Sequence, residues 1–399
     1  MIALCICLLL TPAALVHGSL MDAQTDFGFK IFSGLSQDHS NQSVVFSPFG
    51  VTAVMSLAQL GAAGQTYKDL TGAMGFSMRE RGMSRQQRLL QSAVSAEKEV
   101  EIATGVLVER KMSIEKGYRR ALAKAFLTHP HQVDFSQPEQ AINIINAWVS
   151  DNTNGAISDF LANGSLTEET RLVMLNALHF HGQWKVPFDP RLTQERMFLC
   201  ANGTQTPVHM MRLTDRFHYG EFVTTGGVDY DVIEVPYKGD SLSMLLVSPF
   251  ERDVPLSVLT IELTSHTLRR WRQGLKMVKR QLAVPRFTLV SDLNMKKVLT
   301  DMGLGNMFNL ARADFTRITT DEKLCVSKVL QKVTLEVNED GTKGASASAA
   351  VMFSRMAVEE ITLDKPFLFL VQHKHTGMII IIVKGRFKGP YYVIFLSIL

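Results

Sequence analysis

The spacing of apolar residues predicts helices in the first third of the chain. Ser47 and Pro48 are typical of a helix start, since serine caps free N–H groups and proline fits the first turn. Apolar side chains then recur at helical spacing until Gly61, where the helix is expected to end. The same periodicity predicts a second helix from Glu139 to Val149.

From about Arg171 the pattern becomes that of strands. Residues 172–180 form a mostly apolar run, typical of a strand buried on both faces, and Gly182 breaks it before Trp184. Further strands are expected over 231–237, 242–247, 326–337, 367–371 and 378–383. A helical half that closes over large sheets predicts the class α+β.

The composition agrees with one mixed domain. The 399 residues are 46% hydrophobic and 20% charged, and no repeat or linker divides them. An apolar run near the start is too short to span a bilayer with margin and ends in small residues near Gly18. Residues 1–18 are therefore interpreted as a cleaved secretory signal peptide, with an N-terminal anchor as the alternative. Residues 19–385 then form one domain of a secreted protein of the extracellular space.

The cysteines do not form a disulfide framework. Cys5 and Cys7 would leave with the signal peptide. Cys200 and Cys325 remain, either as a single bridge or as two unpaired buried thiols. Three acceptor sequences for N-glycosylation agree with secretion: Asn41, Asn163 and Asn202.

Basic residues cluster locally although the net charge is only +4. One cluster lies between residues 269 and 280, and the other consists of Arg79, Arg81, Arg85 and Arg88. Either cluster suits a sulfated polysaccharide or an acidic partner, and each suits a solvated helix face equally well. Secretion argues against nucleic acid as the partner.

A segment of small residues from Thr342 to Ala350 fits either a loop or a strand. It contains no proline and no aromatic residue, and Lys343 is its only charge. If Lys343 of an inserted strand faces solvent, the alternate side chains that face inward are small, whereas burial of Lys343 would cost several kcal/mol. Gly341 has no Cβ and can absorb a backbone rotation at the root of the segment.

The motifs of common enzyme classes are missing from the sequence. It has no Gly-x-Ser-x-Gly, no His-Glu-x-x-His and no complete Walker loop. Three His-x-His pairs, at 129/131, 179/181 and 373/375, would each share one face of a strand, but no further ligands are spaced around them. The sequence therefore predicts no enzyme, no cofactor and no metal site.

Several separated blocks of the sequence resemble one family, the serpins. They are Phe46-Ser-Pro-Phe-Gly-Val with Ala58-Gln-Leu-Gly-Ala-Ala-Gly-Gln-Thr, Leu175-Asn-Ala-Leu-His-Phe-His-Gly-Gln-Trp-Lys-Val-Pro-Phe, Val333-Thr-Leu-Glu-Val-Asn-Glu-Asp-Gly-Thr, and Leu363-Asp-Lys-Pro-Phe-Leu-Phe. Within the family, Ser354-Arg-Met-Ala and the pair Glu359-Glu360 most resemble a member that inhibits plasminogen activators. A member that inhibits thrombin-like proteases is the nearest rival, because Asn338-Glu-Asp-Gly-Thr-Lys resembles its hinge.

The resemblance implies a serpin fold, with about nine helices around three β-sheets and an exposed reactive-centre loop over residues 341–360. A trypsin-like serine protease would attack the bond between Arg355 and Met356, after which the loop inserts as a strand and traps the protease. The implied targets are the tissue-type and urokinase-type plasminogen activators, and the protein is expected to be a monomer without a membrane anchor. Inhibition of thrombin-like proteases, or a non-inhibitory serpin that acts as a binding module, are the alternatives.

The resemblance also implies roles for individual residues. The hinge is expected at Glu339, Gly341, Thr342 and Gly344. The region where the sheet opens is expected at Ser47, Asn176, Trp184 and Gln331. Contacts with the protease are expected at Glu359 and Glu360, heparin-like polysaccharide at Arg79, Arg81, Arg85 and Arg88, and vitronectin near residues 116–124. Gln331 stands where many serpins carry histidine, so no pH-sensitive gate is expected there.

The C-terminus departs from the family pattern. Residues 386–399 follow Ile382-Val-Lys-Gly in place of the short tail of serpins, and we interpret them as an alternative or mispredicted final exon. The apolar stretch from Tyr391 is too short for a transmembrane helix.

Overall fold

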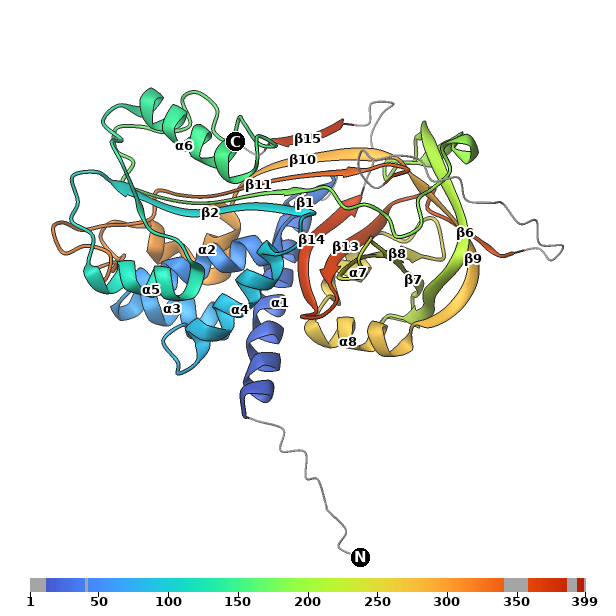
Figure 1. Ribbon diagram of the computed structural model, residues 1–399, viewed down its shortest axis with the longest axis horizontal. Helices are drawn as coiled ribbons and strands as arrows, with labels where there is room; N and C mark the ends of the chain where they lie inside the picture. Colours follow the sequence, from blue (N-terminus) through green and yellow to red (C-terminus); the bar gives the residue numbers. More distant parts are fainter. Residues whose placement is uncertain (1–11, 40–41, 341–357, 386–392, 398–399) are drawn as a thin grey trace, which may run out of the picture.

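Two hydrogen-bonded β-sheets and nine α-helices account for the described part of the computed structural model (Figure 1). Residues 12–39, 42–340, 358–385 and 393–397 are described. The helices are α1 (Pro12–Asp38), α2 (Pro48–Gly61), α3 (Gly64–Met74), α4 (Met83–Ser95), α5 (Lys116–Phe126), α6 (Pro138–Asn152), α7 (Ser257–Ile261), α8 (Ser265–Gly274) and α9 (Lys296–Leu299). Three short helical turns are η1 (Pro190–Leu192), η2 (Thr300–Leu304) and η3 (Gly305–Phe308).

One sheet has six strands, in the order β15-β10-β11-β4-β2-β3. They are β2 (Val100–Glu109), β3 (His131–Val133), β4 (Leu172–Phe180), β10 (Phe287–Asn294), β11 (Lys328–Val337) and β15 (Val393–Ser397). Helix α6 lies on one face of this sheet, and helices α2, α4 and α5 lie on the side of the other face (Figure 1).

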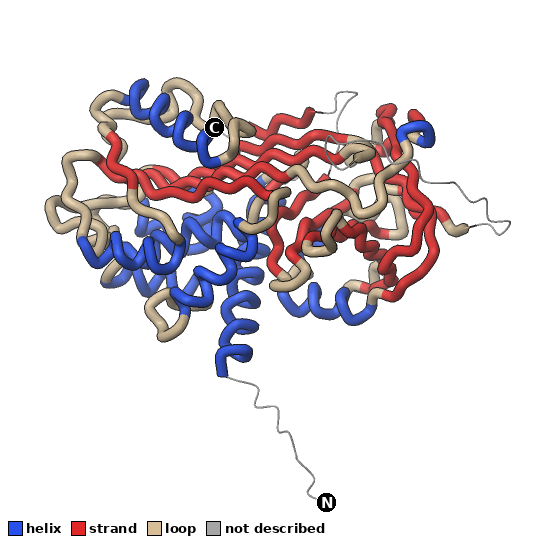
Figure 2. The backbone as a smooth tube through the Cα atoms, viewed as in Figure 1, coloured by secondary structure: helices blue, strands red, loops and turns tan. Residues whose placement is uncertain are grey.

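The second sheet has nine strands, in the order β1-β14-β13-β8-β7-β6-β9-β12, with β5 paired to β6. They are β1 (Val44–Phe46), β5 (Gln194–Leu199), β6 (Gln205–Val223), β7 (Asp229–Pro236), β8 (Leu242–Pro249), β9 (Lys276–Pro285), β12 (Glu360–Thr362), β13 (Phe367–His373) and β14 (Met378–Gly385). Figure 2 shows these strands beside the main group of helices, beneath one end of the six-stranded sheet.

Strand β4 covers residues 172–180, as the apolar run predicted. Its side chains divide between two hydrophobic cores because successive residues of a strand point to opposite faces. Leu172, Met174 and Leu178 belong to the large core on the α2 side. Val173 and Leu175 belong to the smaller core beneath α6. A run of apolar residues is therefore needed at this position.

Helix α2 begins where the Ser-Pro pair predicted. The Ser47 hydroxyl accepts a hydrogen bond from the Gly50 N–H at 3.0 Å, and Pro48 occupies the first turn. Every residue of the helix is buried, which explains why its side chains are apolar or small except at Gln59. The second predicted helix is confirmed as α6, with one more residue at its start and three more at its end.

The expected α+β class is confirmed, as is the number of helices, but the sheets are connected differently. Three sheets were expected, whereas the described strands form two hydrogen-bonded networks. The reason is β6, which is 19 residues long. It pairs with β5 and β9 over most of its length and with β7 over its last six residues, and so joins two groups of strands into one network.

The two ends of the chain add features that the resemblance did not indicate. Residues 1–11 of the expected signal peptide lie outside the described residues, and α1 begins at Pro12. Within the expected C-terminal tail, β15 runs parallel to β10 at the edge of the six-stranded sheet. Among the described helices, none has both the length and the apolar character needed to cross a membrane.

Candidate functional site

Strands β4 and β11 are parallel neighbours at the centre of the six-stranded sheet, and we call their boundary the central seam. It is paired from Val173 opposite Lys328 to Phe180 opposite Leu335. After β11 the chain continues to Asp340, and it returns at Val358 to form β12 on the other sheet. The connection between these points contains the predicted hinge and reactive bond. Its predicted residues Gly341, Thr342, Gly344, Arg355 and Met356 lie outside the described residues.

A buried polar cluster crosses the central seam. Gln331 of β11 accepts a hydrogen bond from the Ser47 N–H at 2.9 Å, and its amide group donates to the Ser47 carbonyl at 3.0 Å and to Asn176 Oδ1 of β4 at 3.0 Å. Asn176 in turn donates to Thr104 Oγ1 of β2 at 3.0 Å. Ser47, Asn176 and Gln331 have no exposed surface. Three of the four residues predicted for sheet opening therefore form one hydrogen-bonded unit.

Gly50 permits this cluster, a role that the sequence did not reveal. A Cβ atom at this position would lie 1.9 Å from Asn176 Oδ1. Any other residue there would push the Asn176 amide away from its partners. The Ser47 hydroxyl also donates to the carbonyl oxygen of Ile380 on β14 at 2.6 Å, which ties the cluster to the second sheet.

Trp184, the fourth predicted residue, lies apart from this cluster, beyond the end of β4. Its ring stacks on Tyr237, with centroids 4.5 Å apart and planes inclined by 8°. Its indole N–H donates to the carbonyl of Asn338 at 2.9 Å, and its backbone N–H donates to the carbonyl of Asp340 at 3.3 Å. Trp184 therefore holds the backbone on both sides of Glu339.

Glu339, the described member of the predicted hinge, is anchored at the same end of the sheet. Its carboxylate accepts a hydrogen bond from Thr193 Oγ1 at 2.8 Å and forms an ion pair with Arg286 at 3.5 Å. Its carbonyl accepts a hydrogen bond from the Phe188 N–H at 2.8 Å. The residue is only 7% exposed, so these partners satisfy a buried charge. The chain entering the hinge therefore starts from a fixed position.

The acidic residues predicted to contact a protease form ion pairs within the chain. Glu359 lies 2.9 Å from Arg280, and 64% of its side chain is exposed. Glu360 is less exposed and lies 3.4 Å from Arg196 and 3.6 Å from Arg212. Their charges are thus partly balanced by arginines of β5, β6 and β9, which are distant in sequence. Of the two, Glu359 is the more accessible to a partner.

The predicted polysaccharide residues lie at and beside a groove between α4 and α5 in which basic side chains outnumber acidic ones. We call it the basic groove. Its basic residues are Arg79, Arg81, Arg85, Arg120, Lys124 and Arg317. Glu80 and Glu115 also line it. Arg88 is exposed on α4, one turn after Arg85. The groove therefore brings part of the predicted arginine cluster next to the region 116–124.

Arg79 differs from the other arginines of the cluster. Its guanidinium group packs over the Tyr67 ring, 3.5 Å from the centroid, and donates a hydrogen bond to the Ala62 carbonyl. Partial burial lowers the pKa of Arg79, and the nearby charge of Arg317 lowers it further. The side chain therefore has a structural role in addition to any contact with an anion.

The described cysteines and sequons can be placed directly. Cys200 and Cys325 are free, so of the two alternatives the unpaired thiols hold, although only Cys200 is fully buried. Asn163 and Asn202 are exposed, which leaves both accessible to modification. Asn41 lies outside the described residues.

Comparisons with known proteins agree with this geometry. The family model described as "Serpin (serine protease inhibitor)" matches residues 22–387. Plasminogen activator inhibitor 1 of Mus musculus is 40% identical over 359 residues, which are 89% of each chain. Glia-derived nexin of Mus musculus is 33% identical over 379 residues, which are 93% of this chain and 94% of the relative.

A solved structure also matches the whole fold. The crystal structure of native protease nexin-1 with heparin superposes with a TM-score of 0.86 at 31% identity, and the match covers 93% of this chain and all of the other. These matches confirm the serpin family and the likeness to plasminogen activator inhibitor 1 that the sequence blocks indicated. The chain belongs to the serpin family of serine protease inhibitors.

Proposed function

We propose that this serpin is a secreted inhibitor of trypsin-like serine proteases that traps its target by loop insertion at the central seam. The protease cleaves between Arg355 and Met356, and the segment from Thr342 onward enters the six-stranded sheet between β4 and β11. The acyl-enzyme that remains attached to Arg355 is carried along and distorted. Arg355 suits the acidic primary pocket of trypsin-like enzymes because guanidinium and carboxylate pair strongly.

The parallel pairing of β4 and β11 is the observation that carries this proposal. The segment after β11 would have to fold back along it, and so would run antiparallel to both strands of the seam. Insertion then replaces one parallel interface with two antiparallel ones, which are slightly more stable per residue. Over the paired length the net gain is about eight hydrogen bonds, or about 8 kcal/mol at about 1 kcal/mol each.

Ordering of the loop opposes this gain, since each fixed residue costs about 1–2 kcal/mol of backbone entropy. The net free energy of insertion therefore depends on whether the inward side chains fit between the strands. Small residues at alternate positions from Thr342 to Ala350 meet that requirement. This fit supports a loop-out form that is metastable, as a trap requires.

Tissue-type and urokinase-type plasminogen activators are the targets we propose, with Glu359 as a contact for a basic surface of the protease. The support is the likeness to plasminogen activator inhibitor 1 and the exposure of Glu359. Inhibition of thrombin-like proteases is the second candidate, and the likeness to glia-derived nexin supports it. A serpin that only binds partners is the third.

Incubation with urokinase-type activator, followed by denaturing gel electrophoresis, tests the mechanism. We expect an SDS-resistant complex, and none from Arg355→Ala. Thr342→Arg should turn the inhibitor into a substrate, because its side chain would be buried in the inserted register. Cleavage without a complex from the unchanged protein would refute trapping. A panel with tissue-type activator, thrombin and plasmin ranks the targets.

We further propose that the basic groove binds heparin-like polysaccharide. The support is the convergence of α4 and α5 side chains, and the related protease nexin-1 was solved with heparin. Vitronectin binding near 116–124 remains a prediction.

We also propose secretion, with cleavage near Gly18, and glycosylation at Asn41, Asn163 and Asn202. The sequence of the first twenty residues supports secretion, and the exposure of Asn163 and Asn202 supports glycosylation at these two positions. Mass spectrometry of the secreted protein tests each position.

A further inference from the structure

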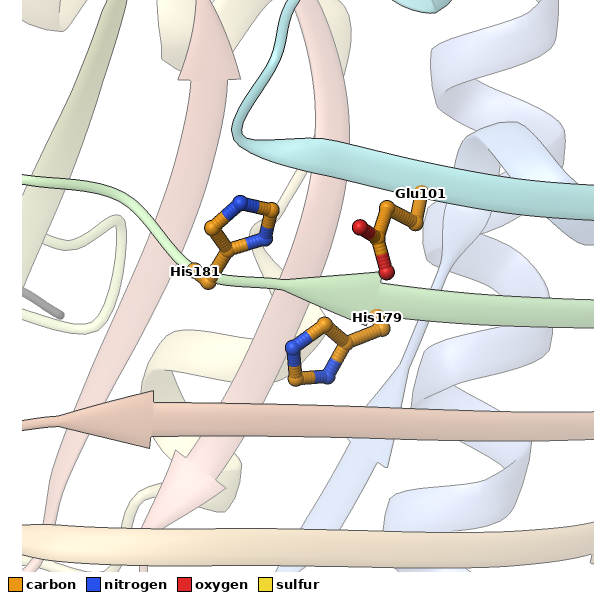
Figure 3. Close-up of side chains that lie close together, drawn as sticks. All are labelled: Glu101, His179 and His181. Atoms are coloured by element: carbon orange, nitrogen blue, oxygen red, sulfur yellow. The ribbon is translucent and has the colours of Figure 1, made fainter. Parts of the chain in front are cut away.

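We infer that Glu101, His179 and His181 form a binding site for a divalent transition metal such as Zn²⁺. One ligand atom from each of the three side chains lies within 4.8 Å of the others. Figure 3 shows Glu101 reaching from β2 toward the two imidazole rings at the end of β4. Two imidazoles and one carboxylate form a ligand set that suits zinc and leaves one position open for water.

The strand register explains why these residues meet. Glu101 of β2 lies directly opposite His179 in the antiparallel ladder. His181 follows two residues later, and its N–H donates to the Glu99 carbonyl at 3.0 Å, which continues the ladder. Residues opposite one another, and residues two apart, point to the same face of a sheet. The sequence argued against a metal because no third ligand was near in sequence, but β2 supplies one in space.

The histidines are arranged as metal ligands require. Their rings stack, with centroids 5.5 Å apart, and the buried Nδ1 of His181 has no hydrogen-bond partner among the described residues. His179 Nδ1 lies 2.6 Å from Thr334 Oγ1 on β11. A proton on that nitrogen would be donated to Thr334 and would leave Nε2 free for a metal.

The electrostatic surroundings favour a cation at this position. Burial lowers the pKa of His179, against the opposing effect of Glu101. Glu336 of β11 adds a second negative charge that acts on His179. Asn154 donates to one Glu101 oxygen at 3.1 Å and orients the carboxylate. All three proposed ligands are only partly buried, so a metal ion can reach them.

The other two His-x-His pairs lack such a set. His373 is bound to Glu97 at 3.2 Å and to Thr376 at 2.8 Å. His131 packs against the Trp148 ring, with centroids 4.8 Å apart. Within the described residues, three potential ligands lie in mutual reach at Glu101, His179 and His181. These pairs therefore supply control variants.

Binding requires the ligand atoms to approach one another. In a tetrahedral zinc site the ligand atoms lie about 3.4 Å apart, as follows from bonds of about 2.1 Å. Rotation of the Glu101 and His181 side chains can bring their ligand atoms closer, because both residues lie at the end of the β2–β4 pair. His179 need not move, and its hydrogen bond to Thr334 is retained.

A bound metal would act on the central seam through His179. Coordination at Nε2 fixes the proton on Nδ1, so that His179 always donates to Thr334 across the seam. The ligands all lie on the β2 and β4 side, so the metal itself does not bridge the seam. The metal therefore favours the closed seam and slows loop insertion. This consequence, unlike the binding itself, rests on the proposed function.

Calorimetric titration of the full chain with Zn²⁺ tests the site. We expect one high-affinity zinc ion per chain, with affinity reduced about 100-fold in Glu101→Gln and in His181→Ala. His375→Ala, which removes an exposed histidine from another pair, should bind like the unchanged protein. Co²⁺ should give the visible absorption of a tetrahedral site, and both ligand variants should abolish it. Equal zinc affinity in all four proteins would overturn the assignment.

The effect on the seam is measured separately, as the decay of inhibitory activity with and without Zn²⁺. Slower decay in zinc is expected for the unchanged protein and for His375→Ala, and no effect for His181→Ala. If zinc binds but the decay is unchanged, coupling to the seam is refuted while the site stands. If no inhibition occurs at all, the proposed function fails, and calorimetry still decides the metal site.

Discussion

Gln331→Ala should loosen the central seam. The substitution removes two hydrogen bonds to the Ser47 backbone and one to Asn176. At about 1 kcal/mol each they account for about 3 kcal/mol, and the Ser47 N–H left buried without a partner adds about 1–2 kcal/mol. We therefore expect the free energy of unfolding to fall by about 4–5 kcal/mol. The bond to Asn176 alone crosses the seam.

Gln59→Ala provides a matched control. Gln59 is a buried glutamine of α2 that also makes three hydrogen bonds to oxygen or nitrogen atoms: its amide group donates to the Phe76 carbonyl at 2.8 Å and to Thr71 at 3.3 Å, and its oxygen accepts from the Met78 N–H at 2.6 Å. Its amide group also makes a longer contact of 3.8 Å with the sulfur of Met74. Both glutamines are fully buried. The two variants should therefore lose similar global stability, while only Gln331→Ala weakens a contact between β4 and β11.

Hydrogen exchange read by mass spectrometry separates the two effects. In Gln331→Ala, the amides of β4 and β11 should exchange about 5–10 times faster than in Gln59→Ala, which corresponds to about 1 kcal/mol for the lost bond across the seam. Inhibitory activity should also decay faster in Gln331→Ala. Equal exchange of the seam strands in both variants would refute the reasoning, because the cluster would then support general stability only.

Three further variants have definite expected outcomes. Gly50→Ala should lower the free energy of unfolding by about 2–4 kcal/mol in urea titrations, because its Cβ overlaps Asn176 Oδ1. Burial raises the pKa of Asp231 to about 7, so the folded state holds this proton more tightly than the unfolded chain, and stability is lost as the pH rises from about 4 to about 7. Asp231→Asn should remove that loss, seen as a higher urea midpoint at pH 7.5 with little change at pH 4. The double variant Arg85→Ala/Arg88→Ala should elute from immobilised heparin at lower salt and bind about tenfold more weakly, and an unchanged elution would count against the basic groove.

Elements whose signal is local in sequence were predictable. The Ser47-Pro48 pair gives the start of α2 because capping and the restricted proline backbone act within one turn. The run 172–180 gives β4 because a strand covered on both faces favours apolar residues on both of its faces. The resemblance then placed Ser47, Asn176 and Gln331 together, which their individual neighbours in sequence could not do.

Contacts that depend on register and on side-chain partners were not predictable. Glu101 meets His179 only because β2 and β4 pair in one register, and a shift by one residue would place them on opposite faces. Glu359 and Glu360 were expected to face a protease, yet Arg280, Arg196 and Arg212 pair with them from other strands. Nothing near these glutamates in sequence indicates those arginines.

Hydrogen bonds between side chains join β4 to β11 across the central seam on both faces of the sheet. On the α2 side Gln331 donates to Asn176, and on the α6 side His179 and Thr334 share a hydrogen bond. Both must break before a strand can enter, at a net cost of about 1 kcal/mol each. Because this cost is small beside the hydrogen bonds that insertion forms, these contacts do not decide which form is more stable. They act on the barrier, since they are lost before the new strand has formed its own bonds. Loss of these two bonds alone should therefore change the lifetime of the loop-out form far more than the stability of the inserted form.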